Sequence, residues 1–333
     1  MARKLRIGIA GFGGIGHLHA AIYQNLPHCE LVAVADCNPA KLASESGDIN
    51  LGLPTRVDLT KLHRHTSIEA MLDGEKLDYL DVALPTDLHS RYAVCALKRG
   101  LDVFCEKPMA RTLPEAEAML AAVRSSGRQL MIGQCLRFWP CYELLLAVRR
   151  AGTYGALRML TLSRISEISP KEWMHDGRRS GGAAWDLHLH DVDFVHALLG
   201  MPRAVTATGC TRHTGEIDNI HALYRYPGEL TVASEASWGS VGFRMGYRAI
   251  FEDAVLRTAD NGARVLLCRR GLPEEELPLA PGNGHGRELA YYTKVLLEGG
   301  RPERCLPEDS YGSLRIAAAE IASARQGGEW LVP

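Results

Sequence analysis

The stretch Leu5-Arg-Ile-Gly-Ile-Ala-Gly-Phe-Gly-Gly-Ile-Gly16 decides the fold of the N-terminal half. Its first six residues are almost all apolar and predict a buried strand, and residues His17–Leu26 carry the apolar spacing of a helix. Between the two, Gly11 permits a tight turn, Gly13 lets the backbone approach a pyrophosphate, and Gly16 lets the helix pack closely on the strand. A strand, a G-x-G-x-x-G turn and a helix in this order predict a dinucleotide-binding turn.

The same alternation of strands and helices continues to about residue 133. Short apolar runs without polar alternation suit a parallel sheet that is covered on both faces, and they span 31–35, 79–84, 101–105 and 129–133. Thr112-Leu-Pro-Glu115 has the form of a capping box and predicts a helix that ends at Gly127. We expect residues 1–133 to form a Rossmann domain, a doubly wound parallel sheet with right-handed crossovers.

The pattern changes in the second half of the chain, from residue 134 to residue 333. Longer runs with partial alternation predict a large, mostly antiparallel open sheet, and these runs span 157–168, 203–212, 219–226, 230–237 and 247–258. Helices are expected at about 184–199 and 311–325, and the second of these is a candidate to pack back toward the first domain. The fold class is therefore α/β, with an N-terminal Rossmann domain followed by an α+β domain that carries the open sheet.

Composition excludes several classes of function. The 333 residues carry a formal net charge of −1, and no basic run is apparent, which argues against nucleic-acid binding. No apolar stretch reaches the roughly 18 residues of a membrane span. The nine cysteines are scattered and odd in number, which fits the reducing cytoplasm better than an oxidising compartment.

Asp36 ends the second expected strand and favours NAD as the cofactor. A carboxylate at this place accepts hydrogen bonds from the adenosine ribose and repels a 2′-phosphate, so NADP is the less favoured cofactor. Other polar residues follow later strands at the edge of the sheet where open α/β sheets bind ligands. The expected cofactor-binding residues are Gly11, Phe12, Gly13, Gly14, Ile15, Gly16, Asp36, Pro85, Thr86, His89, Glu106 and Lys107.

The densest polar cluster of the second half runs from Gly181 to Asp193. On a single helix Asp186 and His190 share a face, whereas His188 and His190 point roughly 200° apart, which does not suit one ion. We therefore expect no metal site here.

Taken together, these motifs resemble the glucose–fructose oxidoreductase / inositol dehydrogenase / MocA (Gfo/Idh/MocA) family over nearly the whole chain. The motifs that carry the resemblance are Gly11–Gly16, Pro85-Thr86 with His89, Glu106-Lys107-Pro108, Arg137-Phe138 with Pro140, Gly181-Gly182 with Asp186 and His190, and the closing Gly327-Gly-Glu-Trp330.

The resemblance implies an active site between the two domains, and a homodimer or homotetramer built through the second sheet. It also implies that Lys107, Asp186 and His190 handle a substrate hydroxyl. An imidazole titrates near neutral pH, so His190 is the expected general base. Lys107 is expected to stabilise alkoxide charge on the same oxygen, and Asp186 to bind a neighbouring hydroxyl.

The expected activity is transfer of hydride between NAD and a secondary hydroxyl of a sugar, sugar acid or inositol-like cyclitol. Candidate substrate-binding residues are Lys107, Arg137, Arg164, Trp173, Asp186, His188 and His190. His188 stands where many members of the family have glycine, and it either fills the pocket or packs on the apolar stripe of the helix. Two alternatives stay open, which are an enzyme that retains and recycles its NAD, and a regulator without catalysis that senses a nucleotide or sugar.

Overall fold

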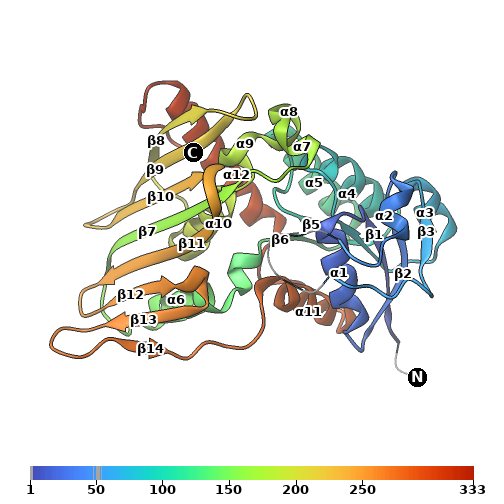
Figure 1. Ribbon diagram of the computed structural model, residues 1–333, viewed down its shortest axis with the longest axis horizontal. Coiled ribbons are helices and arrows are strands. Elements are labelled where there is room, and N and C mark those ends of the chain that lie inside the picture. Colours follow the sequence, from blue (N-terminus) through green and yellow to red (C-terminus); the bar gives the residue numbers. More distant parts are fainter. Residues whose placement is uncertain (1–2, 48, 50–52, 54) are drawn as a thin grey trace. The chain divides into compact units, whose positions relative to one another are not determined.

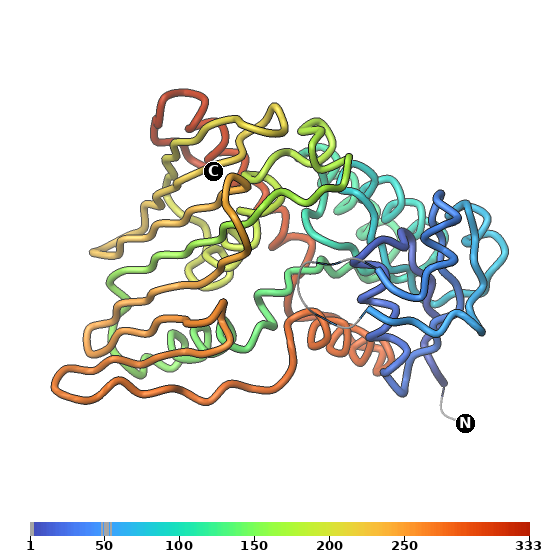
Figure 2. Tube along the Cα trace, in the orientation of Figure 1, coloured from blue at the N-terminus to red at the C-terminus, as the bar shows by residue number. Residues whose placement is uncertain are grey.

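Residues 3–47, 49, 53 and 55–333 are described by the computed structural model. The chain divides into two compact units. The first unit comprises Met1–Gln134 and His285–Glu308, and the second comprises Cys135–Gly284 and Asp309–Pro333. Each unit is therefore assembled from two separate segments of the sequence, as the chain trace in Figure 2 shows.

The first unit contains a six-stranded parallel sheet in the order β3-β2-β1-β4-β5-β6 (Figure 1). Its described strands are β1 (Leu5–Ala10), β2 (Cys29–Ala35), β3 (His63–His65), β4 (Tyr79–Val82), β5 (Asp102–Glu106) and β6 (Leu130–Gly133). The strand order reverses between β1 and β4, and open α/β sheets bind ligands at such a point, beyond the carboxyl ends of the strands. The predicted Rossmann sheet is confirmed.

The helices of this unit follow its strands. They are α1 (Gly14–Gln24), α2 (Pro39–Ala43), α3 (Ile68–Gly74), the 3₁₀ turn η1 (Thr86–Leu88), α4 (His89–Lys98), α5 (Leu113–Ser126) and α11 (Gly284–Leu297). The predicted capping box is present at α5, where Thr112 Oγ1 accepts from the Glu115 N–H and the Glu115 carboxylate accepts from the Thr112 N–H. The helix ends at Gly127, whose φ is 66°.

The strand β3 was not predicted. Its three residues, His-Arg-His, carry no apolar run, and the strand lies at the edge of the sheet. Hydrophobic patterning finds strands that bury side chains, and this one is held by its backbone pairing with β2.

The second unit is built on an eight-stranded sheet in the order β14-β13-β12-β11-β7-β10-β9-β8. The pair β10–β7 is parallel and the other neighbouring pairs are antiparallel. The described strands are β7 (Leu157–Glu167), β8 (Ala204–Thr211), β9 (Ile217–Arg225), β10 (Thr231–Ser237), β11 (Gly239–Phe251), β12 (Val255–Ala259), β13 (Arg264–Cys268) and β14 (Glu275–Leu277). The large, mostly antiparallel sheet is as predicted.

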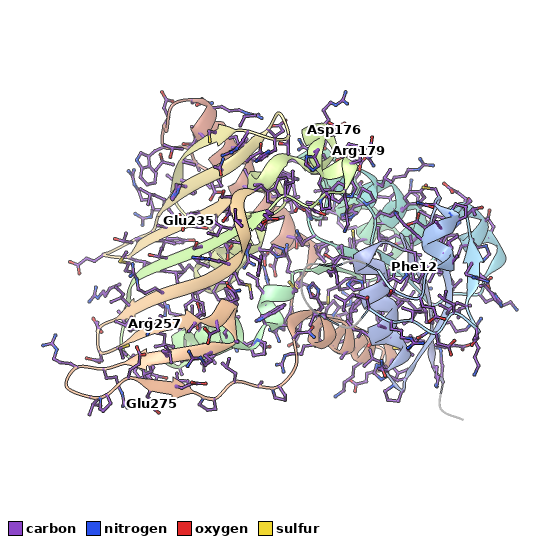
Figure 3. All side chains as sticks on the ribbon, viewed as in Figure 1. Phe12, Asp176, Arg179, Glu235, Arg257 and Glu275 are labelled. Carbon is purple, nitrogen blue, oxygen red and sulfur yellow. The ribbon has the colours of Figure 1, made fainter. Side chains whose placement is uncertain are left out.

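Shorter helices join and cover these strands. They are η2 (Cys135–Phe138), α6 (Pro140–Ala151), α7 (Glu172–His175), α8 (Gly177–Ser180), α9 (Gly182–Trp185), α10 (Leu189–Leu199), η3 (Asp260–Gly262) and α12 (Pro307–Arg325). An aromatic cluster joins α6, α10 and the sheet, since the Tyr142 ring lies 4.7 Å from that of Phe194 and 5.4 Å from that of Tyr247. In Figure 3, Glu235 and Arg257 mark the strands β10 and β12 of this sheet.

Two elements that the sequence predicted as continuous are interrupted in the structure. The expected strand 247–258 is the end of β11 and most of β12, joined by a turn in which the Phe251 N–H donates to Ala254 O. The expected helix 184–199 is two helices, α9 and α10, separated by residues 186–188. Among the residues that the structure describes, no helix is both long and apolar enough to cross a bilayer.

Candidate active site

The glycine turn between β1 and α1 has three positions with three different requirements. Gly11 has a φ of 95°, and a Cβ there would lie 2.4 Å from Ala83 O. A Cβ at Gly16 would lie 2.1 Å from Gly11 O, whereas a Cβ at Gly13 would meet nothing within 4 Å. Gly11 and Gly16 are therefore required by packing, and Gly13 leaves an open cradle above the first turn of the helix.

This cradle is where we expect the diphosphate of a dinucleotide to bind. Gly13 is the N-cap of α1 and offers no side chain to the first backbone N–H groups of the helix, which include those of Gly14 and Ile15. Free N–H groups at a helix N-terminus attract anions. Phe12, marked in Figure 3, is fully buried, and its ring stacks on that of His17 with the centroids 3.8 Å apart, which anchors the turn to α1.

Asp36, which follows β2, is tied to the same turn. Its Oδ2 accepts a hydrogen bond from the Phe12 N–H (2.9 Å), and its Oδ1 accepts one from the Asn38 N–H (2.9 Å). Lys41 Nζ lies 3.3 Å from Oδ2. The carboxylate thus stands beside the glycine turn, where a Rossmann fold binds the adenosine ribose.

The expected contacts after β4 lie in η1 and at the start of α4. Pro85 is the residue before η1, and Thr86 is its first residue and is buried. His89 is also buried, with Nε2 2.7 Å from Leu84 O and Nδ1 2.7 Å from Pro108 O. Its ring nitrogens therefore face backbone carbonyls, and direct contact of His89 with a cofactor stays a prediction.

Glu106 and Lys107 occupy the end of β5. The Lys107 side chain is half-buried, and its backbone N–H donates to Glu106 Oε2 (3.1 Å). The Glu106 side chain is turned into the interior of the unit, where its Oε1 lies 3.3 Å from His19 Nε2. The two neighbouring residues thus differ in environment, and Glu106 as a cofactor contact stays a prediction.

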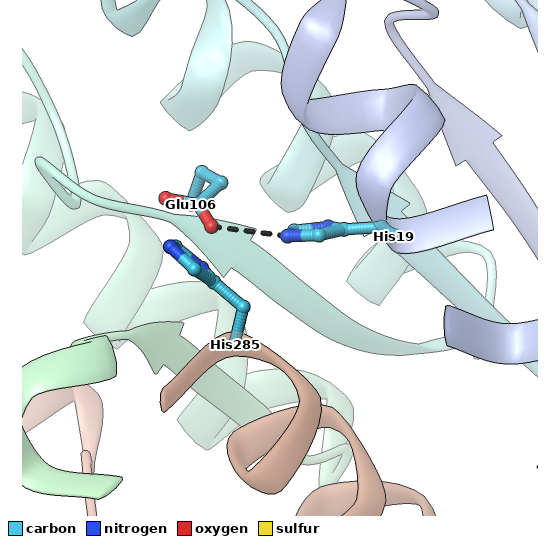
Figure 4. Close-up of side chains that lie close together, drawn as sticks. All are labelled: His19, Glu106 and His285. Atoms are coloured by element: carbon cyan, nitrogen blue, oxygen red, sulfur yellow. Dashed lines mark ion pairs between the residues drawn. The ribbon is translucent and has the colours of Figure 1, made fainter. Parts of the chain in front are cut away.

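The interior partner of Glu106 is a cluster of ionisable side chains. Figure 4 shows His19, Glu106 and His285 directed toward one another from α1, β5 and α11. His19 Nδ1 lies 2.9 Å from Asp81 Oδ2, and His285 Nδ1 lies 3.4 Å from Glu288 Oε1. All five side chains are buried.

Charge within this cluster shifts the pKa values of its members. Burial alone lowers the pKa of His19, but the charges and hydrogen bonds of Asp81 and Glu106 outweigh it and raise that pKa to about 10. Burial raises the pKa of Glu106, and His19 more than offsets this and leaves it below its ordinary value. Burial and the neighbouring Glu106 charge hold the pKa of Glu288 well above its ordinary value. The two neighbouring carboxylates thus favour the protonated form of His19.

In the second unit, Asp186 and His190 lie at a break between two helices. The Asp186 N–H donates to Gly182 O, but the His188 N–H donates to Ala183 O, five residues back, so the helical ladder is interrupted here. The simple i, i+4 helix geometry expected for Asp186 and His190 is thus wrong in detail. Asp186 is nine-tenths buried and His190 is half-buried.

The two glycines before this break are required by packing. Gly181 and Gly182 have φ values of 84° and 73°. A Cβ at Gly181 would lie 2.4 Å from the Trp185 Cβ, and one at Gly182 would lie 2.7 Å from Ile217 O. The glycine pair lets α9 lie against β9.

His188 packs in the interior of the second unit. Its side chain is fully buried, with Nε2 3.1 Å from Glu320 Oε2 and Nδ1 3.5 Å from Ser234 Oγ. Of the two roles left open for His188, packing agrees with this burial, although its partner is a carboxylate on α12 and not an apolar stripe. Contact with substrate stays a prediction.

The two arginines proposed as substrate ligands are held in buried ion pairs. Arg137 donates two hydrogen bonds of 2.8 Å to Asp193 and one of 2.9 Å to Asp309. Arg164 donates to Asp191, with Nε 2.7 Å from Oδ2. Each guanidinium thus has an internal carboxylate, which accounts for its burial without a ligand.

Trp173, on the short helix α7, is half-buried. Its assignment to the substrate stays a prediction.

Three potential metal ligands lie close together in the first unit, away from the Gly181–Asp193 cluster. Within the described residues, one group of three potential ligands has its atoms within 4.8 Å of one another, and it is His19, Glu106 and His285. We predicted no metal site anywhere in the chain, and that absence stays a prediction.

The sequence did not reveal the interior cluster of the first unit. Asp81 gave one signal, because a lone carboxylate inside the buried strand Tyr79–Val82 needs a partner. The partner His19 lies 62 residues away in sequence, and His285 more than 200, so spacing could not bring them together.

Family models match both halves of the chain. Residues 5–134 match the oxidoreductase family with an NAD-binding Rossmann fold, and residues 142–257 match the GFO/IDH/MocA C-terminal domain. The chain belongs to the Gfo/Idh/MocA oxidoreductase family.

Curated members of this family include named dehydrogenases. The chain is 34% identical to inositol 2-dehydrogenase of Rhizobium meliloti over 85% of its own length and 81% of that protein. It is 30% identical to human trans-1,2-dihydrobenzene-1,2-diol dehydrogenase over 68% of its length and 66% of that protein.

Solved structures agree on the family's fold. Aldose-aldose oxidoreductase from Caulobacter crescentus, complexed with glycerol, is 25% identical with a TM-score of 0.85, over 99% of this chain and 100% of that one. Levoglucosan dehydrogenase, in complex with NADH and levoglucosan, is 20% identical with a TM-score of 0.86 over the same shares. The chain therefore shares the fold of these solved structures over 99% of its length.

Proposed function

We propose that this Gfo/Idh/MocA protein is an NAD-dependent dehydrogenase that oxidises a secondary hydroxyl of a cyclitol, sugar or sugar acid. The observation that carries the proposal is the 34% identity to inositol 2-dehydrogenase across most of both chains. The open cradle at Gly13 and the carboxylate of Asp36 supply places for the diphosphate and the adenosine ribose of NAD.

Bound nicotinamide would accept the hydride from the substrate carbon. The protein must then remove the hydroxyl proton and stabilise the oxygen. We assign proton removal to His190, whose imidazole is of the kind that exchanges protons near neutral pH. Lys107 donates a hydrogen bond to the same oxygen and stabilises its developing negative charge. Asp186 binds a neighbouring hydroxyl and favours the correct protonation state of His190.

NADH formation from NAD⁺ across a panel of inositols, aldoses and sugar acids tests this function. A signal that depends on one substrate class, and that is lost in Lys107→Ala, is the expected result. Silence across the panel from protein that binds NAD would contradict the proposal.

A second candidate is an enzyme that retains its nicotinamide and passes hydride from one sugar to another. The 25% identity to an aldose-aldose oxidoreductase over the whole chain favours it. Nucleotide that survives dialysis, with paired oxidation and reduction of two sugars and no NADH release, would select this candidate over the first.

The proposal includes a cytoplasmic homo-oligomer. No disulfide joins any two of the nine cysteines, all of which the structure describes, as suits a reducing compartment. Along β9, His221, Leu223 and Arg225 are exposed on one face of the sheet, and the Leu223 exposure is 47%. We assign this face to a dimer or tetramer contact, and Leu223→Glu is expected to lower the mass measured by light scattering. An unchanged mass would remove β9 from the contact.

A further inference from the structure

Two buried histidines contact the turn that carries Lys107, one on each side. His19 Nε2 lies 3.3 Å from the Glu106 carboxylate, on the residue before Lys107. His89 Nδ1 lies 2.7 Å from Pro108 O, on the residue after it. Both imidazoles are almost completely buried within the first unit.

On the Glu106 side, the contacts form a chain from the interior of the unit to the backbone of Lys107. Asp81 Oδ2 lies 2.9 Å from His19 Nδ1, the His19 Nε2 faces Glu106 Oε1, and Glu106 Oε2 accepts from the Lys107 N–H (3.1 Å). The His19 ring is therefore hydrogen-bonded to Asp81 on one side and lies in ion-pair contact with Glu106 on the other. This contact restricts the rotamer of the Glu106 side chain.

On the Pro108 side, His89 links the ends of two neighbouring strands. Its Nε2 lies 2.7 Å from Leu84 O, after β4, and its Nδ1 faces Pro108 O, after β5. The imidazole thus lies between the two loops at the ligand edge of the sheet, in contact with both.

We propose that His19 and His89 are positioning residues for Lys107, which hold the Glu106-Lys107-Pro108 turn in place without touching substrate. The inference rests on the proposed function, because it assumes that the turn must hold the Lys107 amine accurately against the substrate oxygen. A displacement of about 1 Å in a reacting group costs roughly a hundredfold in rate. A turn without these side-chain contacts would fix the position of the Lys107 amine less accurately.

Other groups around His19 are consistent with this role. Tyr23, from α1, donates to Asp81 Oδ2 (2.7 Å) and lies 2.6 Å from the Tyr79 hydroxyl of β4. His285 and Glu288 face the cluster from α11.

A transition-metal ion is the competing occupant of this cluster, because His19, Glu106 and His285 have the ligand types of a zinc site. A zinc ligand must offer a nitrogen lone pair. The His19–Asp81 hydrogen bond is compatible with either occupant, because a metal-bound histidine also donates its other N–H to a carboxylate. Zinc binding is therefore an outcome that the test must detect.

The variants His19→Gln and His89→Gln test the proposal. The matched control is Tyr292→Phe, which removes a different buried contact to β5, the hydrogen bond from the Tyr292 hydroxyl to Val103 O (2.9 Å). We expect each histidine variant to lose roughly ten- to hundredfold in kcat while KM for NAD changes less than threefold. We expect Tyr292→Phe to keep both constants, even where it loses as much stability. Equal kcat in all three variants would overturn the proposal.

A second measurement separates this inference from the proposed function. Hydrogen–deuterium exchange of the Lys107 and Met109 amides is expected to be at least fivefold faster in the histidine variants than in wild type and Tyr292→Phe. Exchange needs no substrate, so it decides whether the histidines hold the turn even where the substrate panel is silent. Unchanged exchange overturns the inference. Zn²⁺ titration with metal analysis after dialysis completes the test, since one tightly held zinc, lost in His285→Ala, would also overturn it.

Discussion

The guanidinium of Arg164 and the carboxylate of Asp191 face each other in the interior of the second unit. Arg164 Nε lies 2.7 Å from Asp191 Oδ2, Nη2 lies 3.2 Å from Oδ1, and both side chains are almost fully buried. The same Nη2 lies 3.3 Å from the Tyr142 hydroxyl. These contacts hold the Arg164 side chain in the core of the second unit.

The first prediction concerns this buried ion pair. Arg164→Met leaves the Asp191 charge buried without its cation, so we expect the free energy of unfolding to fall by about 3–5 kcal/mol in chemical denaturation. If Arg164 instead serves chiefly as a substrate ligand, KM for substrate will rise while stability stays near that of wild type. Arg158→Met, a change at an arginine on the same strand that is much more exposed, is the control.

The second prediction compares alanine substitutions at two positions of the glycine turn. Gly13→Ala adds a Cβ where nothing lies within 4 Å, so we expect the melting temperature to be kept and NAD binding to weaken at least about tenfold. Gly16→Ala places its Cβ 2.1 Å from Gly11 O, so we expect a loss of stability of about 1–3 kcal/mol or more. Calorimetric titration with NAD and thermal melts measure the two effects. Tight NAD binding by Gly13→Ala would mean that the cradle does not hold the diphosphate.

Asp36 supports a third prediction, on cofactor choice. Asp36→Ser removes the charge that opposes a 2′-phosphate and leaves the Lys41 amine nearby. We expect the ratio of kcat/KM for NADP to that for NAD to rise roughly ten- to hundredfold. Steady-state kinetics with both cofactors measures the ratio, and Asp58→Ser, at an exposed position of the same unit, should leave it unchanged. A ratio that stays at the wild-type value would show that Asp36 does not discriminate.

A fourth prediction concerns the catalytic pair. Lys107→Ala and His190→Ala are expected to lower kcat by about 10²–10⁴-fold with NAD affinity kept, because each removes a group that acts on the substrate hydroxyl. Lys98→Ala, at the exposed end of α4, is the control for loss of a lysine charge. Normal turnover in either variant removes that residue from the mechanism.

The fifth prediction uses the pKa of His19, which is raised to about 10 in the folded protein from an ordinary value of 6.5. A raised pKa means that the folded state holds the proton more tightly than the unfolded chain. The stabilisation from His19 is therefore complete below pH 6.5 and is lost progressively as the pH rises toward 10. We expect the stability gap between wild type and His19→Gln to shrink over this range in urea denaturation. A gap that stays constant from pH 6 to pH 10 would show that His19 does not carry the extra proton.

Local sequence patterns were sufficient for much of the fold. The glycine turn, the buried strands of the first sheet and the Thr112–Glu115 capping box depend on neighbours in sequence, and spacing and residue type could find them. Where a polar strand is held by its partner, as β3 is, the pattern carries no signal. The break between α9 and α10 also escaped prediction, since its apolar periodicity continues through the interruption.

The site was harder to predict because its partners are distant in sequence. Sequence placed Lys107 and Asp36 at strand ends, which the structure confirms as their positions. It could not show that Arg137 is paired with Asp193, or that Glu106 turns inward to His19. Those facts depend on side chains brought together only by the folded sheet.

The first unit is built from two chain segments that are far apart in sequence, so the ribosome synthesises them at different times. Residues 285–308 belong to this unit, where Tyr292 donates to Val103 O and the Ile132 N–H donates to Cys305 O. A nascent chain released only as far as residue 134 lacks these contacts, along with His285 and Glu288. The first unit can therefore be completed only after the second sheet, residues 157–277, has been translated.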